Sequence, residues 1–314
     1  MADYDGKEKA IIMELAMNFL RALSGLRSPA ADFIFQLITR LGEEVIVLGV
    51  ICILYWCINK NAAYKLGLIF FTSGIAVQGL KVSFRIERPW IIDPTFQPVE
   101  SAKAGATGYS FPSGHTQGAT ALYGYFAVNT KRRLIFVLMV LIILAVGFSR
   151  MYLGVHTPYD VLVSLVLTAI TVVLINRFYE VLANKEHILT LSIVLGAVSV
   201  ALCVYSYILA SLGYIDFSQI NDCFKSGGAG LGFAVGLYIE RKYIDFDVHT
   251  RKLSTQVIKV FCGIAGALLI KELPKLIAPG NLLIDFVRYF ITVSWVLIIF
   301  PIIIKRFGAR QKND

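Results

Sequence analysis

The chain has 314 residues, of which 57% are hydrophobic and 16% are charged. So little polar surface cannot cover a core of this size in water, which excludes an ordinary soluble domain and predicts a polytopic membrane protein. The net charge of +9 could suggest nucleic acid, but the cations fall in short clusters between apolar runs. We therefore expect membrane lipids, and no nucleic acid, as their partners.

The amino end is expected to lie along the membrane surface. Glu14, Asn18 and Arg21 interrupt its apolar segment, and acids in the charged start argue against a cleavable signal peptide. The apolar side chains of this segment fall roughly on one helical face: Ile11, Ile12, Leu15, Phe19 and Leu23. Residues 1–30 are thus predicted to form an interfacial amphipathic helix.

The rest of the chain alternates long apolar runs with short polar connections. About nine runs are candidates to cross some 30 Å of hydrocarbon, near residues 44–58, 63–82, 114–129, 134–148, 158–178, 187–213, 225–240, 256–277 and 282–305. The expected fold class is all-α, a polytopic membrane helical bundle of about nine transmembrane helices. We expect the glycines of 225–232 to permit close helix packing.

Basic loops predict the orientation of these spans. Three clusters fall on one side if nine spans are correct: Lys131 to Arg133, Arg241 and Lys242 with Arg251 and Lys252, and Lys305 and Arg306 with Arg310 and Lys312. That side is expected to be cytoplasmic, with the amino end outside. The polar motifs described next then share the outer side.

The first motif runs from Lys81 to Pro89. Lys81 and Arg88 are seven residues apart, so both can project from one face of a helix that Pro89 then stops. Taken alone, the two cations are better explained as interfacial side chains that reach toward the headgroups. Arg85, on nearly the same face, is interpreted as a headgroup or loop contact.

The second motif is Pro112-Ser113-Gly114-His115. Ser113 is a plausible N-cap, and Gly114 permits close backbone approach. Free N–H groups at such a helix start attract anions, and His115 would meet whatever binds there. Alone, the pattern could be ordinary capping.

The third motif joins Ser149 and Arg150 to His156 and Asp160. Thr157 and Pro158 resemble a helix start, so Asp160 could complete a capping arrangement. It could also accept the ring N–H of His156 and make the other nitrogen a stronger nucleophile. The sequence leaves both roles open.

Together the motifs resemble the type 2 phosphatidic acid phosphatase (PAP2) superfamily of membrane phosphatases. The family pattern is Lys-x6-Arg-Pro, Pro-Ser-Gly-His and Ser-Arg-x5-His-x3-Asp, and every fixed position is filled: Lys81, Arg88, Pro89, Pro112, Ser113, Gly114, His115, Ser149, Arg150, His156 and Asp160. The resemblance implies a PAP2-type catalytic transmembrane core over residues 31–180. Residues 181–314 are additional transmembrane helices, and the count of nine is more like the glucose-6-phosphatase branch.

The resemblance also implies roles. His156 would attack phosphorus and become a phosphohistidine, Asp160 would orient it, and His115 would protonate the leaving oxygen and then activate water. The phosphoryl oxygens would be held by Lys81, Arg88, Arg150, Ser113 and the Gly114 backbone. No metal and no cofactor are expected, because one carboxylate and two histidines with other duties are poor ligands for Mg²⁺ or Zn²⁺.

The expected activity is metal-independent hydrolysis of a lipid phosphate or diphosphate, either phosphatidate-like or polyprenyl, on the outer side of the plasma membrane. A soluble sugar phosphate is an alternative that rests on the span count. A headgroup phosphotransferase is another, since an alcohol can replace water. A lipid transporter or scramblase is a third, which the presence of both histidines disfavours.

Overall fold

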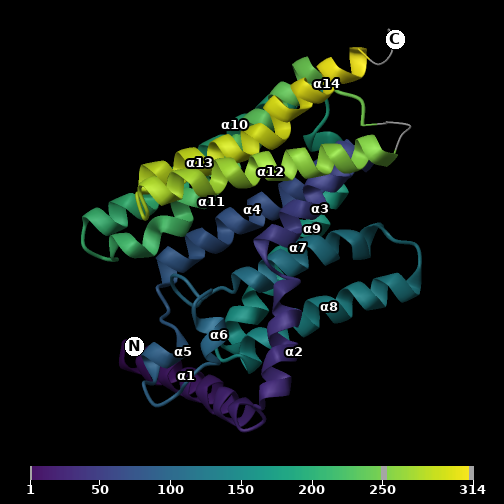
Figure 1. Ribbon diagram of the computed structural model, residues 1–314. Coiled ribbons are helices and arrows are strands. Elements are labelled where there is room, and N and C mark those ends of the chain that lie inside the picture. Colours follow the sequence, from purple (N-terminus) through teal and green to yellow (C-terminus); the bar gives the residue numbers. More distant parts are fainter. Residues whose placement is uncertain (1, 249–252, 311–314) are drawn as a thin grey trace. The chain divides into compact units, whose positions relative to one another are not determined.

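A computed structural model describes residues 2–248 and 253–310. Every regular element in these ranges is a helix (Figure 1). The predicted fold class, an all-α polytopic membrane bundle, is therefore confirmed. Arg251, Lys252 and Lys312, which contributed to the expected orientation, lie outside the described residues.

The helices form two compact units that interleave along the chain. The first unit runs from the amino end to Ile46 and from Leu80 to Ile170, and the second comprises Val47–Gly79 and everything from Thr171 onward. Helices α4 (Lys60–Phe84) and α9 (Pro158–Leu182) each continue from one unit into the other. The units therefore differ from the ranges 31–180 and 181–314, which remain a prediction.

The first unit is built around α8. Besides the last turn of α4 and the first half of α9, its helices are α1 (Ala2–Ser24), α2 (Pro29–Arg40), α5 (Pro89–Ile92), α6 (Glu100–Lys103), α7 (Gly114–Asn129) and α8 (Arg133–Tyr152). Helices α1, α2 and α7 all contact α8. Ser28 caps α2 by accepting the Ala31 N–H, and Pro29 takes the first helical position, where a missing N–H costs nothing.

Helix α1 has two apolar faces. One face packs on the unit, where Met17 and Leu20 form a buried cluster with Phe96. The other face exposes four large apolar side chains: Ile11, Ile12, Leu15 and Phe19. The prediction placed Leu23 on the exposed face, but Leu23 is buried because it follows the packed face. The membrane-surface position of α1 stays a prediction.

The second unit contains most of α3 (Glu44–Ile53), the main part of α4 and all later helices. These are α10 (Ile188–Ser211), α11 (Asn221–Ile239), α12 (Leu253–Ile277), α13 (Leu282–Ser294) and α14 (Phe300–Arg310), with a 3₁₀ turn η2 (Phe217–Ile220). Short π-helical segments extend α3, α11 and α13: η1 (Leu54–Ile58), η3 (Glu240–Ile244) and η4 (Trp295–Ile299). Figure 1 shows α12 and α13 running side by side, and these two helices are in contact.

The glycines of α11 permit the close packing that the sequence predicted. A Cβ at Gly228 would overlap the carbonyl oxygen of Phe286 in α13, and one at Gly227 would overlap the sulfur of Cys203 in α10. Glycine is thus needed on two sides of α11, because only a missing side chain lets three backbones approach this closely. The prediction of close helix packing is confirmed.

Six described helices are long and apolar enough to cross a membrane, or seven if α2 and α3 with η1 form one bent span. All nine expected segments are helical, but α7 has 16 residues and α11, with 19, is rich in glycine. Neither qualifies by length and composition. The expected count of nine, which linked the chain to the glucose-6-phosphatase branch, is not shown.

Candidate active site

The three polar motifs meet in the first unit, where five helix ends come together. Lys81 lies in the last turn of α4, Arg88 at the N-cap position of α5, and Ser113 at the N-cap of α7. Arg150 lies in the last turn of α8, and Asp160 in the first turn of α9. All five side chains are buried. Burial of so much charge is costly unless every group is held by partners, so these partners define the site.

The first motif does not form one continuous helix, contrary to the expectation from its spacing. Helix α4 ends at Phe84, because Arg85 adopts a left-handed backbone conformation with φ of 54°. Pro89 instead begins α5, where its fixed φ suits the first helical position. Lys81 and Arg88 therefore do not share a helical face.

Lys81 and Arg88 instead converge on one loop. Lys81 Nζ donates to the Tyr109 carbonyl at 2.5 Å, and Arg88 donates to the carbonyls of Thr107 at 2.6 Å and Gly108 at 3.0 Å. Hydrogen bonds from charged donors are roughly twice as strong as neutral ones. The two cations thus hold the loop that leads into the second motif.

The second motif is the capped start of α7, as predicted. The Ser113 Oγ accepts the Thr116 N–H at 3.4 Å, and Ser164 Oγ donates to the Ser113 carbonyl at 2.6 Å. The backbone N–H groups of Gly114 and His115 have no hydrogen-bond partner among the described residues. A Cβ at Gly114 would meet nothing within 4 Å. Open space therefore lies in front of free N–H groups at a helix start, which suits an anion.

His115 is half-buried, and its ring makes no hydrogen bond to any described residue. Its main chain packs closely against Gly42, because a Cβ at Gly42 would overlap the His115 carbonyl oxygen. Gly42 lies in the connection between α2 and α3, so this connection seats the start of α7. The imidazole itself is left available for a ligand.

Arg150 is held by a residue that the sequence interpretation missed. Its Nη1 donates to Thr39 Oγ1 on α2 at 2.9 Å, and both residues are buried. The neighbouring Glu43 also attracts the guanidinium electrostatically. The Arg150 Nε is buried without a partner among the described residues, which leaves one N–H for a bound oxyanion.

His156 lies between α8 and α9 with its two ring nitrogens in different surroundings. Nε2 is 3.1 Å from Arg88 Nη1. Nδ1 is 3.5 Å from Asp160 Oδ2 and 3.4 Å from Ser110 Oγ. A guanidinium can only donate, so Nε2 must offer its lone pair and Nδ1 carries the proton of the neutral ring. The ring is thus oriented with a nucleophilic nitrogen toward the cations.

Burial holds the pKa of His156 well below its ordinary value of 6.5, and the nearby cations Arg88, Arg150 and Lys81 lower it further. His115 also lowers the pKa of His156, so the two histidines interact electrostatically. The His156 imidazole is consequently neutral at pH 7, and a neutral imidazole is the form that can attack.

Asp160 caps α9 and lies beside the His156 ring, so its position is compatible with both of the roles that the sequence left open. Its Oδ2 accepts the Thr157 N–H at 2.7 Å, and its own N–H lies 3.4 Å from Thr157 Oγ1, which is a reciprocal cap for α9. The same oxygen faces His156 Nδ1. One carboxylate can therefore start the helix and orient the ring.

Ser110 is the second residue that the sequence interpretation missed. Its hydroxyl donates to Asp160 Oδ2 at 2.6 Å and lies beside His156 Nδ1. Ser110 lies two residues before Pro112, the first residue of the Pro-Ser-Gly-His motif, and belongs to no motif of its own. Only the folded loop reveals that it completes the Asp160 and His156 pair.

No group of three or more His, Cys, Asp or Glu side chains that could hold a metal ion is found in the described ranges. Cys52, Cys203 and Cys223 are buried, whereas Cys262 is exposed on α12.

The geometry indicates what chemistry the site can perform with its own side chains. Three buried cations, a helix start and a neutral histidine gather in the first unit of a membrane protein, an arrangement that suits the binding of a phosphoryl group.

Comparisons with known proteins identify the family. The model of the PAP2 superfamily matches residues 62–183, and that of the PAP2 superfamily phosphatase transmembrane extension matches residues 224–312. Undecaprenyl-diphosphatase BcrC of Bacillus subtilis (strain 168) is 31% identical over 172 residues, which cover 53% of this chain and 86% of that protein. The chain belongs to the PAP2 superfamily of membrane phosphatases and carries its transmembrane extension.

Two further similarities are more distant. Sphingosine-1-phosphate phosphatase 2 of Mus musculus is 25% identical over 217 residues, which cover 66% of this chain and 60% of the mouse protein's length. The crystal structure of a transmembrane PAP2 type phosphatidylglycerolphosphate phosphatase from Bacillus subtilis has a TM-score of 0.47 and 24% identity, covering 54% of this chain and 87% of that one.

Proposed function

We propose that this protein removes phosphate from a phosphorylated lipid through a phosphohistidine formed on His156. The observation that carries the proposal is the orientation of the His156 ring, with Nε2 toward Arg88 and Nδ1 toward Asp160 and Ser110. That arrangement gives a neutral nucleophile whose Nε2 lone pair faces Arg88, one of the cations that would hold an oxyanion.

In the first step, the phosphoryl oxygens are held by Lys81, Arg88, Arg150 and the N-terminus of α7 with Ser113 and Gly114. The Nε2 lone pair of His156 forms a bond to phosphorus while the bond from phosphorus to the lipid oxygen breaks. His115 gives its proton to that oxygen, and the lipid alcohol leaves. Asp160 stabilises the positive charge that the His156 ring acquires.

In the second step, His115, now neutral, accepts a proton from water. The water oxygen bonds to phosphorus, the bond from Nε2 to phosphorus breaks, and inorganic phosphate leaves. The cations offset the negative charge that develops on the phosphoryl oxygens in both steps. No step draws on a metal ion, so the proposal includes activity in the presence of a chelator.

Two observations support a lipid as the substrate. The named substrates of the two relatives, undecaprenyl diphosphate and sphingosine 1-phosphate, both carry phosphate at the end of a long apolar chain. The site lies at the ends of membrane-spanning helices, so a substrate anchored in the bilayer can present its phosphate at the same depth. We therefore favour a lipid monoester or diphosphate over a soluble sugar phosphate.

The orientation and the finer span count belong to the same proposal. With α7 and α11 inside the membrane beside the seven candidate spans, the chain crosses nine times, and the site faces outward across the plasma membrane. Lys131, Arg132 and Arg133 then face the cytoplasm, as basic loops generally do.

The proposal is tested by phosphate release from purified protein in EDTA. The substrates are phosphatidate, sphingosine 1-phosphate, a polyprenyl diphosphate and glucose 6-phosphate. The variants are His156→Ala and, as a matched histidine control, His187→Ala, whose side chain is exposed and hydrogen-bonded to Asn184. We expect turnover of at least one lipid, lost by at least about a thousandfold in His156→Ala and unchanged in His187→Ala.

Other outcomes would contradict parts of the proposal. Substantial turnover by folded His156→Ala would reject the nucleophile. Turnover of glucose 6-phosphate alone would reject the lipid substrate. Transfer of phosphate to an added lipid alcohol, without release to water, would replace the phosphatase by a phosphotransferase.

A further inference from the structure

A large polar pocket lies in the second unit, apart from the residues of the proposed active site. Its volume is about 1020 Å³, at the upper end of the size range of ligand pockets. It is lined where α4 begins at Lys60, where α9 and α10 are joined by residues 183–187, and where α11 passes into η3. Helices α4, α9 and α10 are candidate membrane spans, so the pocket lies at the depth where spans end.

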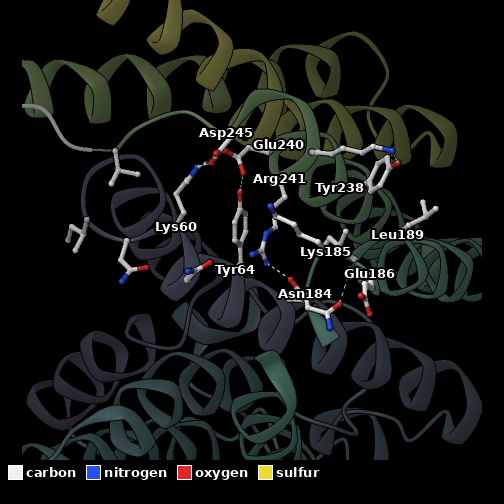
Figure 2. Close-up of a pocket in the computed structure, with 17 residues that line it drawn as sticks. Lys60, Tyr64, Asn184, Lys185, Glu186, Leu189, Tyr238, Glu240, Arg241 and Asp245 are labelled. Atoms are coloured by element: carbon white, nitrogen blue, oxygen red, sulfur yellow. Dashed lines mark hydrogen bonds and ion pairs between the residues drawn. The ribbon is translucent and has the colours of Figure 1, made fainter. Parts of the chain in front are cut away.

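Three acidic residues line the pocket, namely Glu186, Glu240 and Asp245, and the last two share one lysine. Glu240 is fully buried and accepts hydrogen bonds from Lys60 at 3.0 Å and from the hydroxyl of Tyr64. Asp245 accepts from the same Lys60 at 2.8 Å. Figure 2 shows Lys60 and Tyr64 both pointing toward Glu240. One lysine shared by two carboxylates fixes this wall of the pocket and offsets one of their two negative charges.

Three further cations line the pocket and make no hydrogen bond or ion pair with a carboxylate among the described residues: Lys185, Arg241 and Lys242. With Lys60, four cations thus face three carboxylates in the lining. Arg241 donates to the Ala183 carbonyl at 2.7 Å and lies over the Tyr64 ring. Lys242 donates to the hydroxyl of Tyr238 at 2.7 Å, so that hydroxyl keeps its own proton to donate. These contacts orient the cations but do not neutralise them, which leaves a concave set of donors.

We propose that this pocket binds the phosphate group of an anionic phospholipid from the surrounding membrane. A guanidinium, two ammonium groups and a hydroxyl match phosphate oxygens. Apolar side chains line the pocket beside these donors, namely Ile58, Ile188, Leu189 and Val248. A bare phosphate ion would fill little of this volume and would not use the apolar wall, whereas a headgroup with its glycerol and the start of an acyl chain would use both.

The test measures binding of short-chain phosphatidylglycerol to the full-length protein in a neutral detergent, with short-chain phosphatidylcholine and inorganic phosphate as separate arms. Phosphatidylglycerol is a phosphodiester, so monoester hydrolysis does not consume it. The main variant is Lys185→Gln with Lys242→Gln, because both side chains are exposed and neither supports the core. Arg241→Gln serves as a second variant.

The matched control is Arg306→Gln. Arg306 is exposed and does not line the pocket, but its neighbour Lys305 donates to the Ile244 carbonyl of η3, so it lies at the same end of the unit. All variants keep the residues of the proposed active site. Unchanged phosphate release from a lipid substrate will therefore show that they are folded, and any difference in binding belongs to the pocket.

We expect phosphatidylglycerol to bind at least about tenfold more weakly to the double variant and to Arg241→Gln. We expect Arg306→Gln to bind it as the unchanged protein does, and phosphatidylcholine to bind more weakly throughout. Displacement by millimolar phosphate with the same variant dependence would keep the phosphate site but make free phosphate its ligand. Equal phosphatidylglycerol binding by the double variant, or equal loss in Arg306→Gln, would overturn the proposal.

Discussion

At the residue scale, the orientation of His156 depends on a hydroxyl that belongs to none of the motifs. Ser110 donates to Asp160 Oδ2 at 2.6 Å, and the same carboxylate oxygen faces His156 Nδ1. Without this bond, one buried carboxylate oxygen loses a donor and the carboxylate can rotate. Ser110 is thus a positioning residue that acts through Asp160.

We expect Ser110→Ala to lower kcat by about tenfold to a hundredfold, because a hydrogen bond to a charged group contributes roughly 1.5–3 kcal/mol. KM should change little, since the cations that hold phosphate are untouched. Steady-state kinetics on the lipid substrate measure both constants. Ser206→Ala is the control, because that serine is equally buried but donates to the Cys203 carbonyl in the second unit. A rise in KM alone would assign Ser110 to substrate binding.

The lowered pKa of His156 has a consequence for stability as well as for attack. Above pH 6.5 the imidazole is neutral in both the folded and the unfolded chain, so it contributes nothing. As pH falls below 6.5, the unfolded chain takes up a proton that the folded chain does not. The folded state therefore loses stability on acidification, by up to about 1.4 kcal/mol at one pH unit below 6.5.

His156→Gln should remove this acid sensitivity. We expect the Tm of the unchanged protein to fall more between pH 7.5 and pH 5.5 than the Tm of His156→Gln, because glutamine binds no proton. Thermal unfolding in one detergent at both pH values measures the difference. An identical fall in the two proteins would show that His156 titrates alike in the folded and unfolded states.

At the element scale, helix starts were predictable and one helix end was not. Ser113 and Thr157 with Asp160 are local capping signals, and both operate as the sequence predicted. The end of α4 is different, because the spacing of Lys81 and Arg88 fits two helical turns equally well. The left-handed backbone at Arg85 breaks the helix there, and arginine gives no sequence signal for that conformation.

Helix α11 offers a test of packing at this scale. Gly228→Ala places a methyl group on the Phe286 carbonyl of α13, and a helix backbone cannot move aside as a side chain can. We therefore expect the free energy of unfolding to fall by roughly 1–3 kcal/mol, or no folded protein to form. Gly49→Ala in α3 is the matched control, because its Cβ would meet nothing within 4 Å. That change should leave Tm equal or raise it, since alanine favours helix. Equal Tm values for both variants would contradict the close packing of α11.

At the scale of the whole molecule, the sequence predicted which residues gather but not all of the residues that support them. The three motifs lie between Lys81 and Asp160 and are recognisable because polar residues stand at the edges of apolar runs. Thr39 contacts Arg150 across 111 positions of the chain, and a lone threonine in an apolar helix carries no such mark. The sequence predicted nine spans, but only six or seven are shown among the described residues, because α7 is too short and α11 too rich in glycine to qualify by length and composition.

The orientation of the chain is a prediction at this scale. Gly105 is exposed in the loop before the second motif, and Lys131 is exposed in the basic loop after α7. We expect a cysteine at position 105 to react with an impermeant thiol reagent in intact cells, and one at position 131 to react only after lysis. The reverse pattern would show the opposite orientation in the membrane, with the site on the cytoplasmic side.

The central claim is that His156 carries the phosphoryl group, and trapping that intermediate tests it most directly. The purified protein is mixed with a lipid substrate labelled in its phosphate, quenched in alkali and examined for label that is stable to base but lost in acid. We predict such label on the unchanged protein and none on His156→Ala. Label on His115→Ala should both form and disappear more slowly, because His115 serves both steps. Base-stable label on His156→Ala, or its absence from the unchanged protein during turnover, would contradict the account.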